Sequence, residues 1–480
     1  MRATFLGYYR PVKTFYVQNF GCRATQADGA AITRQMLENG FQPSGRAGDA
    51  EVVILNTCTV TASADSDARA AIRRVHRQNP NCQILVTGCY AQRAPEEIAG
   101  LPGVRVVVGN SHKHQLGEIV AGTVGRLEGE FTSGLTQQNF VALNQLTGNE
   151  AARPGSILVG NVFAHTDLLA APVFEASSER TRPNLKIQDG CNNRCSFCVI
   201  PSVRGQSRSM GEARVIEEVK QLVAAGYREV VISGINLGRW GRDLADLAGK
   251  QGLTGLIQAI LDHTRLEKLR ISSVEPMDWT MGLIRLAAQS PRIAKHAHVP
   301  MQSGSDAVLR RMHRKYRPWH YREKILAIRE AMPSAAIGAD VMVGFPGETE
   351  AEFEETRRMV EELPLTYLHV FTYSPRPGTP AAAMKDQVPV QEARARNRVL
   401  RELAETKGEK FKRSFAGQII PAITLGTAPA AGGEANANAS TEALTDNYLR
   451  LVLRGKHDPN QWVQARIDHV TREGLVGSAA

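Results

Sequence analysis

The sequence contains no long hydrophobic run. No stretch among its 480 residues approaches the ~18 consecutive apolar residues of a transmembrane helix, so we expect no membrane span and no membrane partner. Residues 1–20, MRATFLGYYRPVKTFYVQNF, also lack the apolar segment that a signal peptide carries. We therefore expect a cytoplasmic protein.

Cysteine is scarce as well. The chain has seven cysteines, an odd number, and a chain of this length buries a core without disulfide staples. Both facts argue against a disulfide framework and favour free thiols or metal ligands. The seven are Cys22, Cys58, Cys82, Cys89, Cys191, Cys195 and Cys198.

Acidic residues are outnumbered by basic ones. The 58 Lys and Arg residues exceed the 48 Asp and Glu residues, which gives a net charge of +10. Such an excess favours a polyanionic partner, above all nucleic acid. A basic surface that binds no partner is the alternative.

The first 121 residues alternate strand and helix patterns. Within residues 12–121, strands at 14–19, 52–56, 83–87 and 105–108 alternate with helices at 30–39 and 67–78. This order predicts a small α/β domain with a parallel sheet. Residues 122–180 are polar, with weak strand signals at 156–163, and are predicted to be a linker.

The same alternation returns in residues 181–409. Strands are predicted at 184–188, 228–233, 268–272, 297–300, 336–343 and 366–373, with helices such as 211–225, 319–331 and 349–362 between them. Six such units predict an incomplete TIM-like βα barrel. Its chemistry should then gather where the strands end.

The C-terminal part changes character. A helix at 391–413 is strongly basic, which fits either an RNA contact or an ordinary solvated face. Residues 410–480 then alternate like short antiparallel strands, interrupted by a low-complexity loop at 427–440 whose role stays open. We expect a small β-barrel of the oligonucleotide-binding type.

The motif DGCNNRCSFC places Cys191, Cys195 and Cys198 just after the first strand of the predicted barrel. A structural zinc site would add a fourth ligand, yet no histidine lies within ten residues of Cys191 or Cys198. A [4Fe–4S] cluster held by three thiolates instead keeps one iron open for a substrate. The three-cysteine count favours a reactive cluster over an electron carrier.

Three further cysteines follow strands of the N-terminal domain. Cys22, Cys58 and Cys89 each come directly after a predicted parallel strand, at the sheet edge where α/β proteins bind ligands. We therefore expect them to form a second set of three ligands. Cys82 precedes its strand and should lie at the opposite end, so we interpret it as an incidental thiol.

These motifs resemble the methylthiotransferases among the radical S-adenosylmethionine (SAM) enzymes. The resemblance covers nearly the whole chain, and the C-terminal segment is similar to the RNA-binding TRAM domain. It is carried by NFGCRATQAD (19–28), NTCTVTASAD (56–65), TGCYAQRAP (87–95), KIQDGCNNRCSFCVIPSVRGQSRS (186–209), SGINLGRWGRDL (233–244), HVPMQSGSDAVLRRMHRKY (298–316) and DVMVGFPGETEAEF (340–353).

The resemblance implies an enzyme with two [4Fe–4S] clusters and S-adenosylmethionine as cofactors. The strings NTCTVTASAD, AAIRRVHRQNP, TGCYAQ and GINLGRWGRDL are most similar to the subgroup that methylthiolates C2 of N6-threonylcarbamoyladenosine at position 37, beside the tRNA anticodon. Subgroups acting on isopentenyladenosine-37 or on a ribosomal-protein aspartate are the alternatives. A metal-stabilised RNA-binding scaffold without activity is a further one.

The resemblance also suggests contacts and partners. The partners would be the anticodon stem-loop of tRNA, an external electron donor and a sulfur donor. Cofactor contacts are expected from Phe197, Ser233, Gly234, Asn236, Ser273, Glu275 and Gly344. RNA contacts are expected from Arg204, Arg310, Arg311, Arg314, Lys315, Arg317, Arg398 and Arg401, and for Arg204 pairing with a carboxylate is the alternative. No catalytic residue is assigned beyond the cluster ligands.

Overall fold

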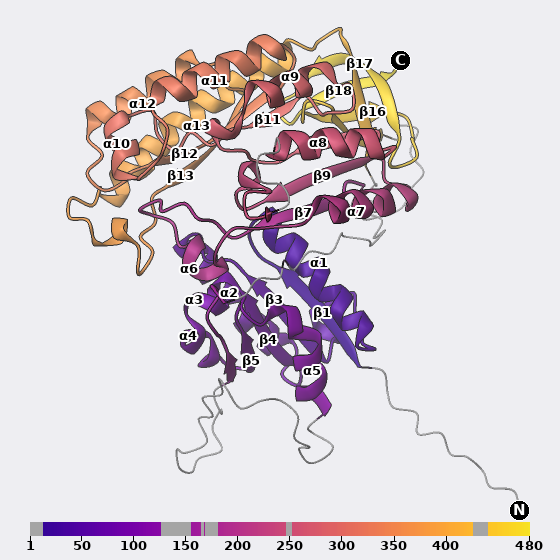
Figure 1. Cartoon of the computed structure of the whole chain (residues 1–480), viewed down its shortest axis with the longest axis vertical. Coiled ribbons are helices and arrows are strands. Elements are labelled where there is room, and N and C mark those ends of the chain that lie inside the picture. Colours follow the sequence, from indigo (N-terminus) through magenta and orange to yellow (C-terminus); the bar gives the residue numbers. More distant parts are fainter. Residues whose placement is uncertain (1–12, 126–154, 165–167, 169–180, 246–251, 426–439) are drawn as a thin grey trace, which may run out of the picture. The chain divides into compact units, whose positions relative to one another are not determined.

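The computed structural model describes residues 13–125, 155–164, 168, 181–245, 252–425 and 440–480 (Figure 1). The chain divides into two compact units. Unit 1 comprises residues 1–171 together with Ser202–Gly205, and unit 2 comprises residues 172–201 and 206–480. The predicted loop at 427–440 and most of the predicted linker lie outside the described residues.

Unit 1 is a parallel sheet with helices on both faces. The strand order is β2-β1-β3-β4-β5-β6, and every described pairing is parallel. The strands are β1 (Thr14–Asn19), β2 (Gln42–Pro43), β3 (Val52–Thr57), β4 (Gln83–Gly88), β5 (Val104–Val108) and β6 (Ser156–Leu158). The helices are α1 (Arg23–Glu38), α2 (Ala62–Gln78), α3 (Cys89–Arg93), α4 (Pro95–Ala99) and α5 (Leu116–Gly125).

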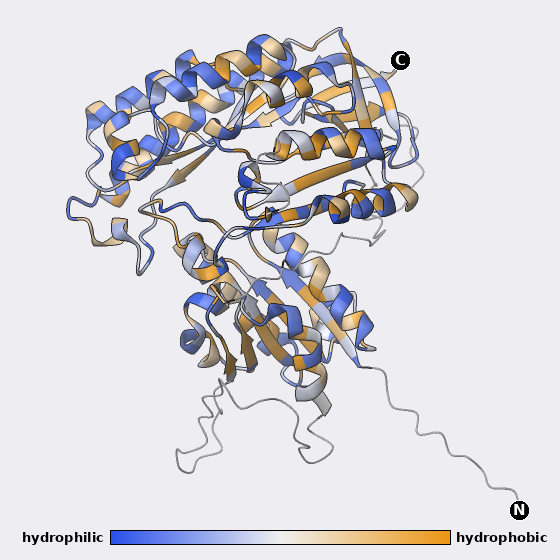
Figure 2. Cartoon of the chain, viewed as in Figure 1, coloured by the Kyte–Doolittle hydropathy of each residue, from blue (hydrophilic) through white to orange (hydrophobic). Residues whose placement is uncertain are grey.

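The sheet of unit 1 is buried on both sides. Every residue of β3 is buried, and two separate hydrophobic clusters pack against the two faces of the sheet. The central strands β3, β4 and β5, which lie between these clusters, are accordingly mostly hydrophobic (Figure 2). The predicted fold is confirmed here, but α1 begins at Arg23, directly after Cys22, rather than at residue 30.

Unit 2 contains the predicted partial barrel. Six parallel strands form two sheets, β7-β9-β10 and β11-β12-β13, which isolated parallel bridges join at Leu269–Ile293 and Ser273–His298. The strands are β7 (Asn184–Asp189), β9 (Glu229–Gly234), β10 (Lys268–Ile271), β11 (His296–His298), β12 (Ala336–Val343) and β13 (Tyr367–Thr372), and β8 (Arg208–Ser209) adds an antiparallel edge to β7.

The helices of unit 2 follow the βα order expected of a barrel. They are α7 (Glu212–Ala224), α8 (Gly252–His263), α9 (Met281–Gln289), α10 (Asp306–Arg311), α11 (Pro318–Ala331), α12 (Glu350–Glu362) and the basic α13 (Val390–Arg413). Helices α11, α12 and α13 lie alongside the β11–β12–β13 sheet (Figure 1). Within the described residues, no helix is long and apolar enough to cross a membrane.

A closed five-stranded barrel completes unit 2, as predicted, in the order β14-β15-β16-β18-β17. It consists of β14 (Ile419–Thr424), β15 (Ser440–Thr445), β16 (Arg450–Arg454), β17 (Trp462–Val470) and β18 (Leu475–Ala479). The sequence pattern did not predict β15. The β15–β16 turn packs on the partial barrel. There Asn447 donates to the Ser334 carbonyl (3.0 Å), and the Tyr448 ring lies 4.7 Å from that of His296.

Candidate functional site

The central site lies on the loop after β7. Three donors point at two of its sulfur atoms. The Asn193 amide and the Asn236 side-chain amide lie 3.4 and 3.5 Å from the Cys191 Sγ, and the Arg314 guanidinium lies 3.3 Å from the Cys195 Sγ. Hydrogen bonds of this kind stabilise sulfur that carries negative charge. The loop is therefore built for thiolates.

Burial disfavours the ionised form of two thiols of this loop, those of Cys191 and Cys198. Burial raises the pKa of the Cys198 thiol to about 12, and burial also raises the pKa of Cys191. At neutral pH such thiols keep their protons unless a metal ion replaces them. The donor set thus fits a bound metal better than it fits free reactive thiolates.

The contact between Arg314 and Cys195 was not predicted from the sequence. Arg314 was expected on an RNA surface, yet its side chain is only 6% exposed and forms an ion pair with Glu275. Both residues also line an open pocket together with Cys195, Asn193, Arg239 and Lys315. No local pattern links Arg314 to Cys195, because 119 positions separate them.

The other predicted cofactor contacts lie at or after the ends of the barrel strands. Phe197 packs edge-on against Phe345 at 6.4 Å. Ser233 is buried, and its hydroxyl has no hydrogen-bond partner among the described residues. Gly234 packs so tightly that a Cβ would lie 2.8 Å from the Gln188 Oε1. The backbone of Ser273 forms an isolated parallel β-bridge with that of His298. Gly344 has a positive φ of 72° and packs against Ala393.

The N-terminal site is formed by strand ends. Cys22 begins α1 after β1, Cys58 follows β3, and Cys89 starts α3 after β4. Two glycines with positive φ bring these segments together. A Cβ on Gly21 would lie 2.8 Å from the Cys58 Sγ, and a Cβ on Gly88 would lie 2.2 Å from the Thr57 carbonyl oxygen. Only glycine permits this approach at those backbone angles.

Side-chain donors also face the sulfur atoms of the N-terminal site. The Thr25 hydroxyl lies 3.7 Å from the Cys22 Sγ, and the Asn110 amide lies 3.6 Å from the Cys89 Sγ. Burial, followed by the nearby Cys89 and Cys22, raises the pKa of Cys58 to about 12. Asn110 comes two residues after β5, so the strand-end rule that located the cysteines could have located it too.

A buried charge network supports this site. Lys113 and Arg204 donate to the same Asp28 oxygen at 3.1 and 2.9 Å, and all three side chains are at most 4% exposed. Lys113 also reaches the Asn56 side chain at 3.3 Å, two residues before Cys58. Arg204 was expected to contact either an RNA phosphate or a carboxylate; it pairs with the Asp28 carboxylate and is buried within unit 1. The three groups sum to a charge of +1 beside the thiols.

The remaining predicted RNA contacts differ in exposure. Arg311 and Arg317 are half-buried and pair with Glu352 (2.7 Å) and Asp306 (3.3 Å). Cys82, predicted to be incidental, is buried in a hydrophobic cluster of unit 1. The exposed members of the predicted set are Arg310, Lys315, Arg398 and Arg401.

Comparison with known proteins agrees with this architecture. Residues 185–360 match the model of the radical SAM superfamily, and residues 14–109 match the family described as Uncharacterized protein family UPF0004. A solved radical SAM methyltransferase, TsrM of Kitasatospora setae, covers 77% of this chain and 77% of its own at a TM-score of 0.52 and 13% identity. At that identity the likeness supports the fold alone.

Two curated relatives extend over most of the chain. The threonylcarbamoyladenosine tRNA methylthiotransferase MtaB of Bacillus subtilis is 36% identical over 93% of this chain and 91% of its own length. The tRNA-2-methylthio-N(6)-dimethylallyladenosine synthase of Novosphingobium aromaticivorans is 35% identical over 79% of each.

The partial barrel and its three-cysteine loop are those of a radical SAM enzyme, which implies a [4Fe–4S] cluster and S-adenosylmethionine. With relatives of this identity and coverage, the chain belongs to the radical SAM methylthiotransferase family. Membership of an enzyme family argues against the alternative of an inactive RNA-binding scaffold.

Proposed function

We propose that this enzyme adds a methylthio group to C2 of N6-threonylcarbamoyladenosine at position 37 of tRNA. The observation that carries the proposal is the near-complete alignment with the Bacillus subtilis enzyme, over 93% and 91% of the two chains. The dimethylallyladenosine enzyme of Novosphingobium aromaticivorans has similar identity, but the alignment covers only 79% of its own length. A tRNA substrate also agrees with the net charge of +10, and we propose a cytoplasmic location for the enzyme.

The central cysteines are the residues that would hold the radical-generating cluster. When bound there, the cluster and S-adenosylmethionine supply a carbon-centred radical that removes hydrogen from the adenine C2, a position without an acidic proton. The protein's part is to hold and shield the reacting groups. Asn236 and Arg314 place donors on the sulfur atoms of Cys191 and Cys195, and Phe197 packs against Phe345 beside the same loop.

The N-terminal cysteines fit a second cluster for the same reasons. Cys22, Cys58 and Cys89 meet at one sheet edge, Thr25 and Asn110 face two of the sulfur atoms, and Lys113 and Arg204 bring positive charge. Three thiolates around a [4Fe–4S] cluster leave one iron open. In our proposal Cys22, Cys58 and Cys89 would hold a cluster that supplies the sulfur, which an external donor would replace. A second S-adenosylmethionine would supply the methyl group, and a separate donor would supply electrons.

The proposed tRNA contacts are the exposed members of the basic set. Arg398 and Arg401 lie on α13, whereas Arg310 and Lys315 lie at and after α10. The C-terminal barrel is the second proposed RNA-binding element because its fold resembles that of oligonucleotide-binding barrels. Arg204 and Arg314, being buried and paired with carboxylates, are assigned to the two cysteine sites instead.

Deleting the C-terminal barrel is a poor test of RNA binding. The fully buried Arg270 pairs with Glu229 at 2.6 Å and donates to the Asp446 carbonyl at 3.1 Å, so a deletion at residue 415 would expose this ion pair. Uncovering a buried pair destabilises the remaining fold. Point substitutions of exposed arginines test RNA binding without destabilising the fold.

The substrate is tested by mass spectrometry of tRNA nucleosides. The gene is expressed in a host that lacks its own methylthiotransferases but contains both threonylcarbamoyl- and isopentenyladenosine. We expect the methylthio form of threonylcarbamoyladenosine to appear, and to be absent when Cys198 is replaced by serine. Methylthiolation of isopentenyladenosine alone would overturn the assignment in favour of the second subgroup.

A further inference from the structure

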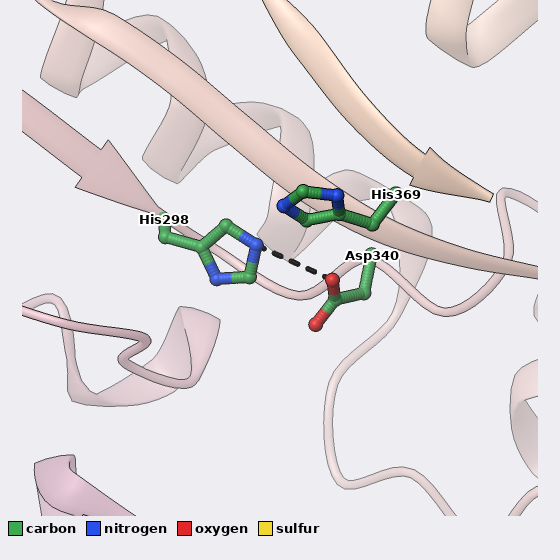
Figure 3. A group of neighbouring side chains, drawn as sticks. All are labelled: His298, Asp340 and His369. Carbon is green, nitrogen blue, oxygen red and sulfur yellow. Dashed lines mark ion pairs between the residues drawn. The ribbon is translucent and has the colours of Figure 1, made fainter. Parts of the chain in front are cut away.

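A cluster of metal-binding side chains lies in unit 2 outside both cysteine sites. His298, Asp340 and His369 each offer one ligand atom, and these atoms all lie within 4.8 Å of one another. Figure 3 shows the three side chains converging from three different strands. The function proposed above uses none of them.

The sheet register places these side chains together. Asp340 of β12 lies directly opposite His369 of β13, and His298 of β11 lies opposite Gly338, two residues before Asp340 on the same face of the sheet. The three ligands therefore project from adjacent parallel strands rather than from loops. Strands hold such groups more rigidly than loops do, which favours a preformed site.

The donor set and its spacing suit a transition metal. Two imidazoles and one carboxylate are typical ligands of catalytic zinc and of non-haem iron(II), which keep further positions open. The His298 Nε2 and the Asp340 Oδ1 are 3.3 Å apart. That distance is close to the ~3.3 Å expected between two ligands of a tetrahedral metal with bonds of ~2.0 Å.

The surroundings of His298 also fit a ligand. Its Nε2 is buried and makes no hydrogen bond of normal geometry with a described residue, although Asp340 lies within ion-pair distance. The Tyr367 ring stacks against the imidazole at 6.1 Å and 25°, which restrains its orientation. His369 is exposed, so an ion can enter from solvent. Orienting contacts of this kind are usual around metal-bound histidines.

We propose that His298, Asp340 and His369 bind one divalent transition-metal ion, Zn²⁺ or Fe²⁺, with its remaining positions open to oxygen ligands. This inference does not depend on the tRNA substrate or on the second cluster. A simple His298–Asp340 ion pair is the competing explanation. It requires a protonated imidazole, whereas a metal requires a neutral one and binds less well as the pH falls.

The probe is Mn²⁺, and its binding is monitored by electron paramagnetic resonance. The sample is the full-length protein with its iron–sulfur content intact and without S-adenosylmethionine. Mn²⁺ favours carboxylate and imidazole ligands over thiolates, so empty cysteine sites do not take it up. We expect one Mn²⁺ to bind per chain and added Zn²⁺ to displace it.

Two variants and a control decide the assignment. Asp340→Asn keeps the side-chain shape and His369→Ala removes an exposed side chain, so both should fold while weakening Mn²⁺ binding roughly tenfold or more. His263→Ala, which removes another exposed histidine, at the end of α8, should leave binding unchanged. Absence of Mn²⁺ binding in the unaltered protein, or binding that persists in both variants, would overturn the proposal.

Discussion

The two cysteine sites differ in how the chain assembles them. In unit 2, Cys191, Cys195 and Cys198 lie on one loop after a single strand. In unit 1, Cys22, Cys58 and Cys89 follow three strands, and they meet only because the parallel sheet aligns those strand ends. The first site needs one loop in place, whereas the second needs a folded sheet. Damage to the sheet should therefore abolish the second site selectively.

The sites also differ in how positive charge reaches them. Arg314 contacts the Cys195 sulfur directly at 3.3 Å. In unit 1 the buried cations Lys113 and Arg204 donate to Asp28, and Lys113 reaches Asn56 near Cys58. The positive charge therefore acts by direct contact at one site and through intervening groups at the other.

The largest effects should come from the ligands. Cys198→Ser and Cys89→Ser should each remove about four of about eight irons per chain, because each breaks one of the two proposed clusters and leaves the other. Iron and sulfide analysis after anaerobic reconstitution measures this. Cys82→Ser, which alters a thiol in the hydrophobic core, should retain all of the iron. Loss of all iron from either ligand variant would show that the sites are not independent.

Gly88→Ala should disrupt the N-terminal site through a change in the backbone and leave the central site intact. The new Cβ would lie 2.2 Å from the Thr57 carbonyl at a φ of +100°, so the segments carrying Cys58 and Cys89 must move apart. We expect loss of about half of the iron and a lower melting temperature.

Gly226→Ala is the matched control for that change. Gly226 has a similar φ of +93° but no atom within 4 Å of the added Cβ, so only backbone strain of about 1–2 kcal/mol should result. Its iron content should be unchanged. Equal iron loss in both variants would contradict a specific role for Gly88.

Arg314→Gln should lower the reduction potential of the central cluster. Removing a positive charge beside the sulfur disfavours the more negative, reduced state. A unit charge ~6 Å away in a medium of effective dielectric ~20 corresponds to about 3 kcal/mol, or on the order of 100 mV. Redox titration followed by electron paramagnetic resonance measures the shift, with the exposed Arg310→Gln as control. An unchanged potential would show that the contact has no electrostatic role.

Lys113→Met should shift the potential of the N-terminal cluster in the same direction but by less. Its charge acts through Asp28 and Asn56 rather than by contact with sulfur, so a shift of a few tens of millivolts is expected on the same reasoning. The same titration measures it in protein carrying Cys198→Ser, where only that cluster contributes. A shift larger than that of Arg314→Gln would reverse the comparison between the sites.

The smallest effect should come from the proposed RNA surface. Replacing Arg398 and Arg401 by alanine should weaken tRNA binding several-fold and reduce the salt dependence of log affinity by up to about 1.8, the value for two phosphate contacts. Filter binding at several salt concentrations measures this, and iron content should not change. An unchanged salt slope would remove these residues from the surface.

The sequence predicted the six βα units of the barrel and all six cysteine positions relative to the strand ends. Both rest on local patterns, namely hydrophobic strands and thiols directly after them, which survive without knowledge of the tertiary fold. Even the distant set of Cys22, Cys58 and Cys89 could be grouped, because parallel strands share one C-terminal edge.

The partners of the cysteines could not be predicted in the same way. Arg314 was predicted to contact RNA because it lies in a basic run, and for Arg204 a carboxylate was only one of two alternatives. Their burial depends on carboxylates far away in the chain, Glu275 and Asp28. Such pairings are set by packing between elements, which no short pattern encodes. The convergence of His298, Asp340 and His369 depends in the same way on sheet register.

Division of labour between the two sites is tested most directly by a protein in which Cys22, Cys58 and Cys89 are all replaced by alanine. Incubated with reductant, S-adenosylmethionine and tRNA, it should still release 5′-deoxyadenosine but form no methylthiolated nucleoside. Methylthiolation that persists without these cysteines would contradict the account.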